Sequence, residues 1–381
     1  MVIDLVDQLI CNAISARASD IHLEPTPTGL RVRWRIDGVL YDSQFVEHRL
    51  MAQLLSRVKV LSKLNIAEKR IPQDGHFQIQ FNNEKIDLRI STFPSIYGEK
   101  IVIRILDKSV QTIELDQLGF CNTMLSEFRE LINKSSGFLL VTGPTGSGKT
   151  TTLYATLLEL NRADSNIMTL EDPVEYHVDG IVQGHIHSDT GFTFAKGIRA
   201  LLRQDPDIAL IGEIRDRESA HIAIEAALTG HLIFSTLHTS DAPGAIIRLM
   251  DMGIEPFLIN ASLTGVLSQR LARKICAHCK ESYTPTEAEQ KLLEQFGSSA
   301  NLLFKGRGCN DCNGLGNKGR IGIFELLRMT SNLRSCIVSH PIFDLICEQA
   351  KRDGMKRMHS DGILKIENGI ISLNEFLRIL S

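Results

Sequence analysis

The glycine-rich segment GPTGSGKT at residues 143–150 constrains the fold more than any other part of this sequence. It matches the pattern G-x-x-x-x-G-K-[ST] at every fixed position. The preceding residues, FLLV at 138–141, are typical of a buried strand, and the following residues, TTLYATLL at 151–158, are typical of the start of a helix. This order of strand, loop and helix predicts a phosphate-binding loop rather than an accidental glycine-rich turn.

The phosphates of a nucleotide are expected to bind in this loop. Glycines let the backbone wrap a polyphosphate with its N–H groups pointing inward, and the helix behind adds the positive end of its dipole. We predict that Lys149 reaches the terminal phosphates and that the hydroxyl of Thr150 binds Mg²⁺. The predicted nucleotide-binding residues are Gly143, Pro144, Thr145, Gly146, Ser147, Gly148, Lys149, Thr150 and Thr151.

Strand and helix patterns alternate around this loop. Apolar strands are predicted at 138–142, 167–170, 208–212 and 232–236, with helical stretches between them. This alternation predicts an α/β domain in which helices wrap a parallel sheet. The active-site groups of such sheets lie at the carboxyl ends of the strands.

Glu213 directly follows one of these strands, and it is the first candidate for the group that orients or deprotonates an attacking water. The segment around it is typical of a Walker B element. Gly212, however, stands where many P-loop enzymes have a metal-binding Asp. The alternative is that Glu213 only pairs with Arg215.

Two more candidates follow neighbouring strands. Glu171 lies in TLEDPVE at 169–175, directly after a buried strand, and is the second catalytic candidate; the alternative is a set of ordinary solvated acids. His238 leaves the strand at 232–236 on the same edge as Glu213, so it is a candidate sensor of the γ-phosphate. His231 precedes that strand and is expected to serve packing, since a lone His is more often structural.

Four of the eight cysteines form two C-x-x-C pairs. Cys276 and Cys279 make the first pair, and Cys309 and Cys312 make the second. Two such pairs predict a tetrahedral zinc site, and four thiolate ligands without an open position indicate a structural rather than a catalytic metal. Four unrelated thiols would not be expected to form matched pairs beside glycine-rich turns.

The first part of the chain has the pattern of a separate α+β domain. A helix is expected from about residue 3 to 18, alternating strands with a tight turn at 30–41, another helix at 48–64, and strands at 77–81, 85–90 and 100–106. His22 and Glu24 lie on extended chain, where the interpretation slightly favoured is exposed strand surface.

Length and charge narrow the class of protein. The 381 residues are enough for two or three domains. The formal charge of -3 provides no strong field toward nucleic acid or anionic lipid. No stretch of about 18 apolar residues occurs, and the start of the chain does not resemble a signal peptide, so we expect a cytoplasmic protein.

Taken together, the motifs resemble those of the type II secretion and type IV pilus assembly ATPases, a family of hexameric motors. The segments that carry the resemblance follow in family order: ASDIHLEP at 18–25, RIPQDG at 70–75, the loop at 143–150, TLEDPVEY at 169–176, RQDPDIALIGEIRD at 203–216 and TGHLIFSTLHT at 229–239. The resemblance implies ATP as the nucleotide, ATP hydrolysis as the activity, and partners in the inner-membrane platform of a secretion or pilus machine. Peripheral association with the inner membrane would then occur through those partners.

The resemblance also implies site residues in the first domain. In the family, this domain of one subunit closes over the nucleotide of another, and its arginines stabilise the phosphate charge; the matching residues here are Arg70, Arg89 and Arg104. The cysteine pairs favour a secretion or pilus extension motor over a retraction motor. One departure is His76, where the family commonly has Arg. The other is that this sequence does not include the further N-terminal domain of larger members, as expected either for a short member or for a trimmed chain.

The expected fold is α/β: a RecA-like P-loop ATPase domain with a parallel sheet, preceded by an α+β PAS-like domain and followed by a zinc module and a small helical subdomain. The predicted boundaries are an N-terminal domain at 1–106, a linker at 107–118, the ATPase domain at 119–268, the zinc-binding module at 269–325 and the helical subdomain at 326–381.

The alternative functions are a translocase for nucleic acid, with Arg270, Arg273 and Lys274 as possible contacts, and a scaffold that binds nucleotide without turnover. The charge balance argues against the translocase, and no nucleic-acid partner is expected.

Overall fold

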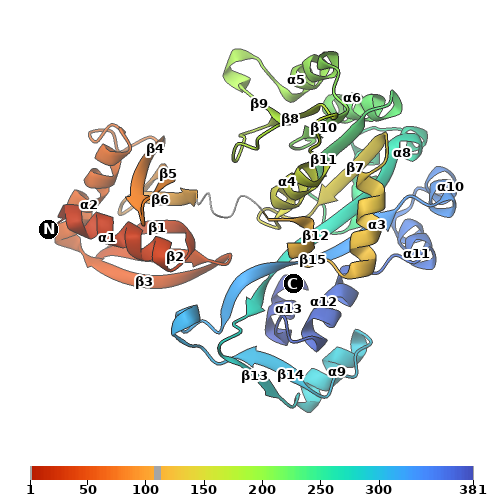
Figure 1. Cartoon of the computed structure of the whole chain (residues 1–381). Helices are drawn as coiled ribbons and strands as arrows, with labels where there is room; N and C mark the ends of the chain where they lie inside the picture. Colours follow the sequence, from red (N-terminus) through yellow and green to blue (C-terminus); the bar gives the residue numbers. More distant parts are fainter. Residues whose placement is uncertain (1, 107–112, 381) are drawn as a thin grey trace. The chain divides into compact units, whose positions relative to one another are not determined.

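The computed structural model describes residues 2–106 and 113–380. The chain divides into two compact units, Met1–Gln111 and Thr112–Ser381, and each is described by itself (Figure 1). Part of the predicted linker, residues 107–112, lies outside the described residues. The rest of it contains a short 3-10 turn, η2 (Leu115–Gln117).

The first unit is a six-stranded antiparallel sheet with two helices beside it, as expected for an α+β domain. Its strand order is β3-β2-β1-β6-β5-β4. The elements are α1 (Val2–Ser15), β1 (Ala18–Thr26), β2 (Gly29–Ile36), β3 (Val39–Glu47), α2 (His48–Leu61), β4 (Gln73–Phe81), β5 (Glu84–Ser95) and β6 (Gly98–Leu106).

The two faces of this sheet differ in polarity because side chains alternate along each strand. Ile21 and Leu23 of β1 are each 1% exposed and belong to the apolar face. His22 and Glu24 belong to the other face, yet the interpretation of both as exposed strand surface is wrong. His22 is only 9% exposed, and the Glu24 carboxylate is largely covered by the side chains that bind it.

Glu24 is the centre of a charged network on this polar face. Arg33 donates two hydrogen bonds to its carboxylate at 2.8 and 2.9 Å, and Lys100 donates another at 2.8 Å. Burial alone would raise the pKa of Glu24, but these hydrogen bonds lower it to about 2. A carboxyl group whose pKa falls on folding stabilises the fold at pH values above its unfolded pKa. That stabilisation is lost as the pH falls through about 2.

We therefore expect Glu24→Gln to lower the free energy of unfolding at pH 7 by about 1–3 kcal/mol and to weaken its dependence on acid pH. Trp34, the single tryptophan, follows Arg33 on β2, so its fluorescence during urea unfolding reports on this unit. Glu84→Gln, at an exposed end of β5, is the matched control and should behave like the unmodified chain. Identical pH profiles for Glu24→Gln and the unmodified chain would contradict this role.

The second unit is built on a seven-stranded sheet in the order β15-β12-β7-β11-β10-β8-β9. All neighbouring pairs are parallel except β12 with β15, as expected for an α/β domain with a parallel sheet. The strands of this sheet are β7 (Gly137–Thr142), β8 (Ile167–Glu171), β9 (Val182–His185), β10 (Ile208–Ile211), β11 (Leu232–Leu237), β12 (Leu263–Ile275) and β15 (Asn317–Arg328).

Helices cover both faces of this sheet. Successive side chains of β7 point to opposite faces and pack against different sets of helices. Leu139 and Val141 pack in the same core as α3 (Asn122–Ile132) and α4 (Lys149–Leu160). Phe138 and Leu140 pack in the opposite core, which includes residues of α5 (Phe194–Leu201), α6 (Arg217–Leu228), α7 (Ala242–Asp251) and α8 (Pro256–Ser262). Two short 3-10 turns, η3 (Ser188–Thr190) and η4 (Leu202–Gln204), flank α5.

The remaining elements pack in two different places. Those at 331–352 join the core that contains α7 and α8, whereas those at 287–306 and 358–380 share a core with Ala272 of β12 and Ile323 of β15. In chain order, the remaining elements are β13 (Lys280–Tyr283), α9 (Glu287–Gln295), β14 (Leu303–Gly306), η5 (Asn310–Cys312), α10 (Ser331–Ser339), α11 (Phe343–Arg352), α12 (Met358–Glu367) and α13 (Leu373–Leu380). The two long strands run without interruption through residues 268 and 325, where the sequence analysis places domain boundaries. Among the described residues, no helix combines the length and hydropathy needed to cross a bilayer.

Candidate active site and metal site

The glycine-rich loop joins the end of β7 to the start of α4, as the motif predicts. Gly143, Gly146 and Gly148 have φ angles of +145°, +78° and +87°, a range that side chains disfavour. A Cβ on Gly143 would also lie 2.3 Å from the backbone oxygen of Gln269, so space as well as conformation requires glycine there.

Lys149 begins α4 and points back across the loop. Its Nζ donates hydrogen bonds to the carbonyl oxygens of Gly143 at 2.9 Å and Pro144 at 3.1 Å. Burial lowers the pKa of Lys149, and the nearby charge of Glu213 opposes this effect. Thr145 and Thr150 are exposed on the same loop. The loop therefore presents an ammonium group and a hydroxyl within two consecutive residues.

Glu213 lies at the carboxyl edge of the sheet that also carries the glycine-rich loop. It follows β10, and β11 lies between β10 and β7, with all three strands parallel. Its Oε2 is 3.7 Å from Nε2 of His238, which leaves β11 at the same edge. Its other oxygen accepts a hydrogen bond from Arg215. The pairing raised as the alternative role of Glu213 is thus present, together with a contact to His238.

Gly212 has a packing reason to be glycine. A Cβ at this position would lie 3.3 Å from the carbonyl oxygen of Leu170 and 3.4 Å from Cα of Glu171. The backbone N–H of Gly212 donates to the same Leu170 oxygen at 2.8 Å. A larger residue here would press on β8, so the carboxylate at the end of β10 is supplied by Glu213.

Glu171 ends β8 and is only 4% exposed. It accepts hydrogen bonds from the hydroxyl of Tyr154 on α4 and from Thr169 at 2.5 Å. Burial raises the pKa of Glu171, and these hydrogen bonds oppose that rise. In this arrangement Glu171 joins β8 to the helix that follows the phosphate loop, and its catalytic role stays a prediction.

His231 lies at the opposite end of β11 from His238. Its Nδ1 is 3.0 Å from the carbonyl oxygen of Ala226, at the end of α6. This contact closes the turn between helix and strand.

The three arginine candidates belong to the first unit. Arg70 is 89% exposed and pairs with Glu68 at 3.1 Å, while Arg104 binds Asp20 at 2.9 Å. Arg89 is directly opposite Arg104 across β5 and β6, and His76 is opposite Arg89 across β4 and β5. His76, Arg89 and Arg104 therefore form one row across the polar face of the sheet, and Arg70 lies outside that row.

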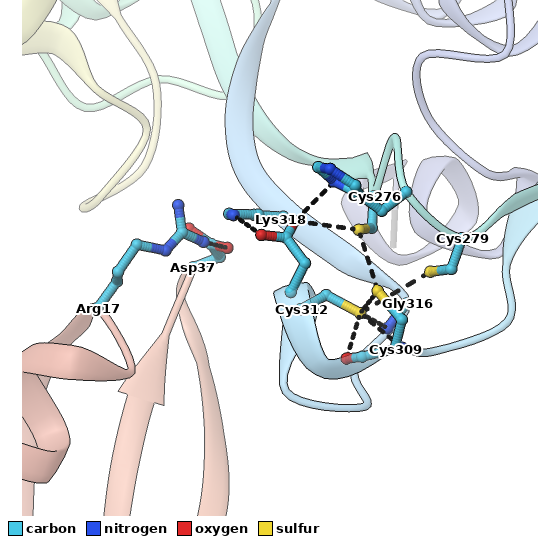
Figure 2. Close-up of polar contacts among 10 residues, drawn as sticks. Arg17, Asp37, Cys276, Cys279, Cys309, Cys312, Gly316 and Lys318 are labelled. Carbon is cyan, nitrogen blue, oxygen red and sulfur yellow. Dashed lines mark hydrogen bonds and ion pairs between the residues drawn. The ribbon is translucent and has the colours of Figure 1, made fainter.

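The two cysteine pairs converge in the second unit, as Figure 2 shows. The four Sγ atoms lie within 4.8 Å of one another. Measured separations are 3.8 Å for Cys276 to Cys309, 3.8 Å for Cys279 to Cys312 and 3.7 Å for Cys309 to Cys312. A tetrahedral metal with bonds of about 2.3 Å to sulfur requires sulfurs about 3.8 Å apart. The spacing of the thiols thus fits a zinc-sized ion.

Backbone N–H groups also point at these sulfurs. Gly308 donates to Cys279 at 3.3 Å, and both Cys309 and Gly316 donate to Cys312 at 3.2 Å. Such donors stabilise thiolate charge, which is the form of cysteine that binds metal. The geometry and the donor set agree with the predicted metal site.

Gln269 and Glu325 are two buried residues that the sequence analysis did not select. Gln269 of β12 contacts the phosphate loop, and Glu325 of β15 accepts from the N–H groups of Ala242 and Met358 at 2.9 and 3.1 Å. Glu325 is a polar residue inside the apolar run IFELL, and this signal could have identified it, whereas Gln269 lies between Ser268 and Arg270 and gives no such signal.

Comparison with known proteins identifies the family. A family profile described as "Type II/IV secretion system protein" matches residues 1–378. The chain belongs to this family. Its relatives include the type II secretion system ATPase E of Vibrio cholerae, 46% identical over 378 residues that cover 99% of this chain and 75% of the relative. Another is the type IV pilus assembly ATPase PilB of Myxococcus xanthus, 45% identical over 98% of this chain and 67% of the relative.

Solved structures share the fold of this chain over nearly its whole length. The ATPase DotB of Legionella pneumophila matches with a TM-score of 0.72 at 21% identity, covering 99% of this chain and 95% of that one. The pilus retraction motor PilT with bound ADP matches with a TM-score of 0.63 at 25% identity, covering 98% and 96%. The resemblance drawn from the motifs and the predicted fold class are both confirmed.

Proposed function

We propose that this chain is a Mg²⁺-dependent ATPase that works as a hexameric motor for type II protein secretion or type IV pilus assembly. The relatives named above are ATPases of those two machines, and PilT was solved with ADP. The observation that carries the proposal is the meeting of Lys149, Glu213 and His238 at one edge of the sheet. These are the groups that a phosphate and an attacking water require.

Each residue then has a distinct task. The residues of the loop at 143–151 hold the phosphates through backbone N–H groups, and Lys149 neutralises their charge. Thr150 holds Mg²⁺, which supplies further charge neutralisation when bound. Glu213 orients the attacking water, and His238, beside it, contacts the γ-phosphate. Glu171 fixes the end of β8 against α4 from its buried position.

In the hexamer, arginines of a neighbouring subunit supply the further positive charges that stabilise the phosphates. Arg89 and Arg104 lie in the basic row of the first unit, and with the more exposed Arg70 they act on the nucleotide of a neighbouring subunit. His76 stands at the end of that row, where the family commonly has Arg, so its contribution depends on pH in a way an arginine's would not.

The wider setting follows from the same family relationship. Zinc bound by Cys276, Cys279, Cys309 and Cys312 stabilises the module around β13 and β14. The protein acts in the cytoplasm, at the inner membrane, through the platform proteins of its machine. Neither of the alternatives, a nucleic-acid translocase or a scaffold without turnover, has a specific observation in its favour.

Phosphate release tests the proposal. The unmodified chain with Mg²⁺ and ATP should release phosphate, and Lys149→Ala should reduce both ATP affinity and the rate by at least about 100-fold. ATP binding without phosphate release would indicate the scaffold. Release that requires added DNA would indicate the translocase.

A further inference from the structure

Gln269 holds the phosphate loop from a strand outside the loop motif. It lies on β12 and is 1% exposed. Its Nε2 donates to the carbonyl oxygen of Ser147 at 2.8 Å, and its Oε1 accepts from the hydroxyl of Thr152 at 2.8 Å. A single amide therefore binds the loop backbone and the first turn of α4 at the same time.

Two glycines of the loop are packed against this same residue. A Cβ on Gly143 would lie 2.3 Å from the backbone oxygen of Gln269, and a Cβ on Gly148 would lie 3.3 Å from its Nε2. The loop is thus in contact with β12 at both its first and its last glycine. A shift of Gln269 would move both ends of the loop.

The hydrogen bond to Ser147 has a consequence for the next N–H group. A trans peptide is planar, so the carbonyl of Ser147 and the N–H of Gly148 point in opposite directions. Because Gln269 holds this carbonyl toward β12, the N–H of Gly148 must point away from β12. An N–H fixed in this direction costs no reorientation when it binds an anion.

We propose that Gln269 is a positioning residue for nucleotide binding: it fixes the peptide between Ser147 and Gly148 so that the loop is preorganised for a β-phosphate. This inference rests on the proposed function, because it concerns the same nucleotide. It goes beyond that function in assigning part of the affinity for phosphate to β12, the strand that continues to Ile275 beside the metal site.

Gln269→Met tests this role, because methionine keeps the length of the side chain and removes both hydrogen bonds. We expect affinity for ATP and for ADP to fall about ten-fold. Affinity for AMP, measured by competition, should not change, since AMP has no β-phosphate. The melting temperature should stay close to that of the unmodified chain. Thr152→Val, which removes one of the two hydrogen bonds and keeps the shape, should cause a smaller loss for ATP and ADP, not additive with Gln269→Met.

Ser268→Ala is the matched control on the same strand. Ser268 is fully buried, and its hydroxyl has no hydrogen-bond partner among the described residues, so its removal should leave all three affinities unchanged. Equal losses for ATP, ADP and AMP in Gln269→Met would overturn the inference in favour of general structural damage. Unchanged ATP affinity in both Gln269→Met and Thr152→Val would also overturn it. If the unmodified chain itself bound no ATP, the proposed function would fail first.

Discussion

Glu213→Gln is expected to lower kcat for ATP hydrolysis by about 100- to 10,000-fold while leaving ATP affinity nearly unchanged. The amide keeps the size of the side chain but replaces one acceptor oxygen by an NH₂ donor, so it can neither accept a proton nor hold the attacking water as a carboxylate does. Glu213 is 22% exposed at the side chain, so solvent and a bound phosphate can both reach it. Steady-state phosphate release and direct ATP titration measure the two quantities separately.

Glu218→Gln is the control for removing a carboxylate from the same region. Glu218 lies in the first turn of α6, where its exposed carboxylate pairs with Arg199 at 2.8 Å. Its kcat should equal that of the unmodified chain. A second variant, His238→Ala, should reduce the rate less than Glu213→Gln, because His238 contacts only one oxygen of the Glu213 carboxylate and the carboxylate itself remains. Should Glu213→Gln keep a rate within about three-fold of normal, the catalytic assignment would be wrong.

The part of the site built by neighbouring residues could be predicted from the sequence. The strand, loop and helix around Lys149 are contiguous, so the local pattern alone predicts their order. Glu213 and His238 could also be placed on one edge, because parallel strands present their carboxyl ends together. The structure brings these two side chains within 3.7 Å.

The contacts of β12 and β15 could not be predicted in this way. These strands pair with each other, and β12 also pairs with β7, which lies more than 100 residues earlier in the chain. The hydroxyl of Thr264, for example, donates to the carbonyl oxygen of Phe138 across a separation of 126 residues. No local periodicity records a pairing over that distance. For this reason the predicted boundary at residue 269 assigns Gln269 to the metal module, although its side chain binds the phosphate loop.

The burial of polar residues is the other feature that could not be predicted from the sequence. Glu24 and Glu171 look alike in sequence, since each directly follows a leucine in a strand pattern, and neither pattern shows which partners will cover it. In the structure Glu24 binds two cations, whereas Glu171 binds two hydroxyl groups. These partners come from other strands or helices in three of the four cases. The two cations lower the pKa of Glu24, whereas burial raises the pKa of Glu171 against the opposing effect of its hydrogen bonds.

Removal of the metal is expected to unfold the cysteine module while ATP binding persists. A structural zinc site contributes about 10–16 kcal/mol of apparent binding energy, far more than the short strands β13 and β14 can supply alone. We expect one zinc per chain by elemental analysis. Chelation or Cys279→Ser should release it and expose residues 276–316 to hydrogen exchange. The phosphate loop lies between β7 and α4, and among the described residues the apolar cores of these two elements contain none of the four cysteines of the metal site.

Cys121→Ser is the matched control for this change. Cys121 stands at the N-cap of α3, where serine is favoured, and lies outside the cluster of four thiols. Its zinc content and hydrogen exchange should be those of the unmodified chain. If Cys279→Ser weakened ATP binding as much as Lys149→Ala does, the metal would have to act on the nucleotide site through β12, and the separation of structural and catalytic roles would be lost. If Cys279→Ser retained full zinc content and protection, the four thiols would not form the ligand set.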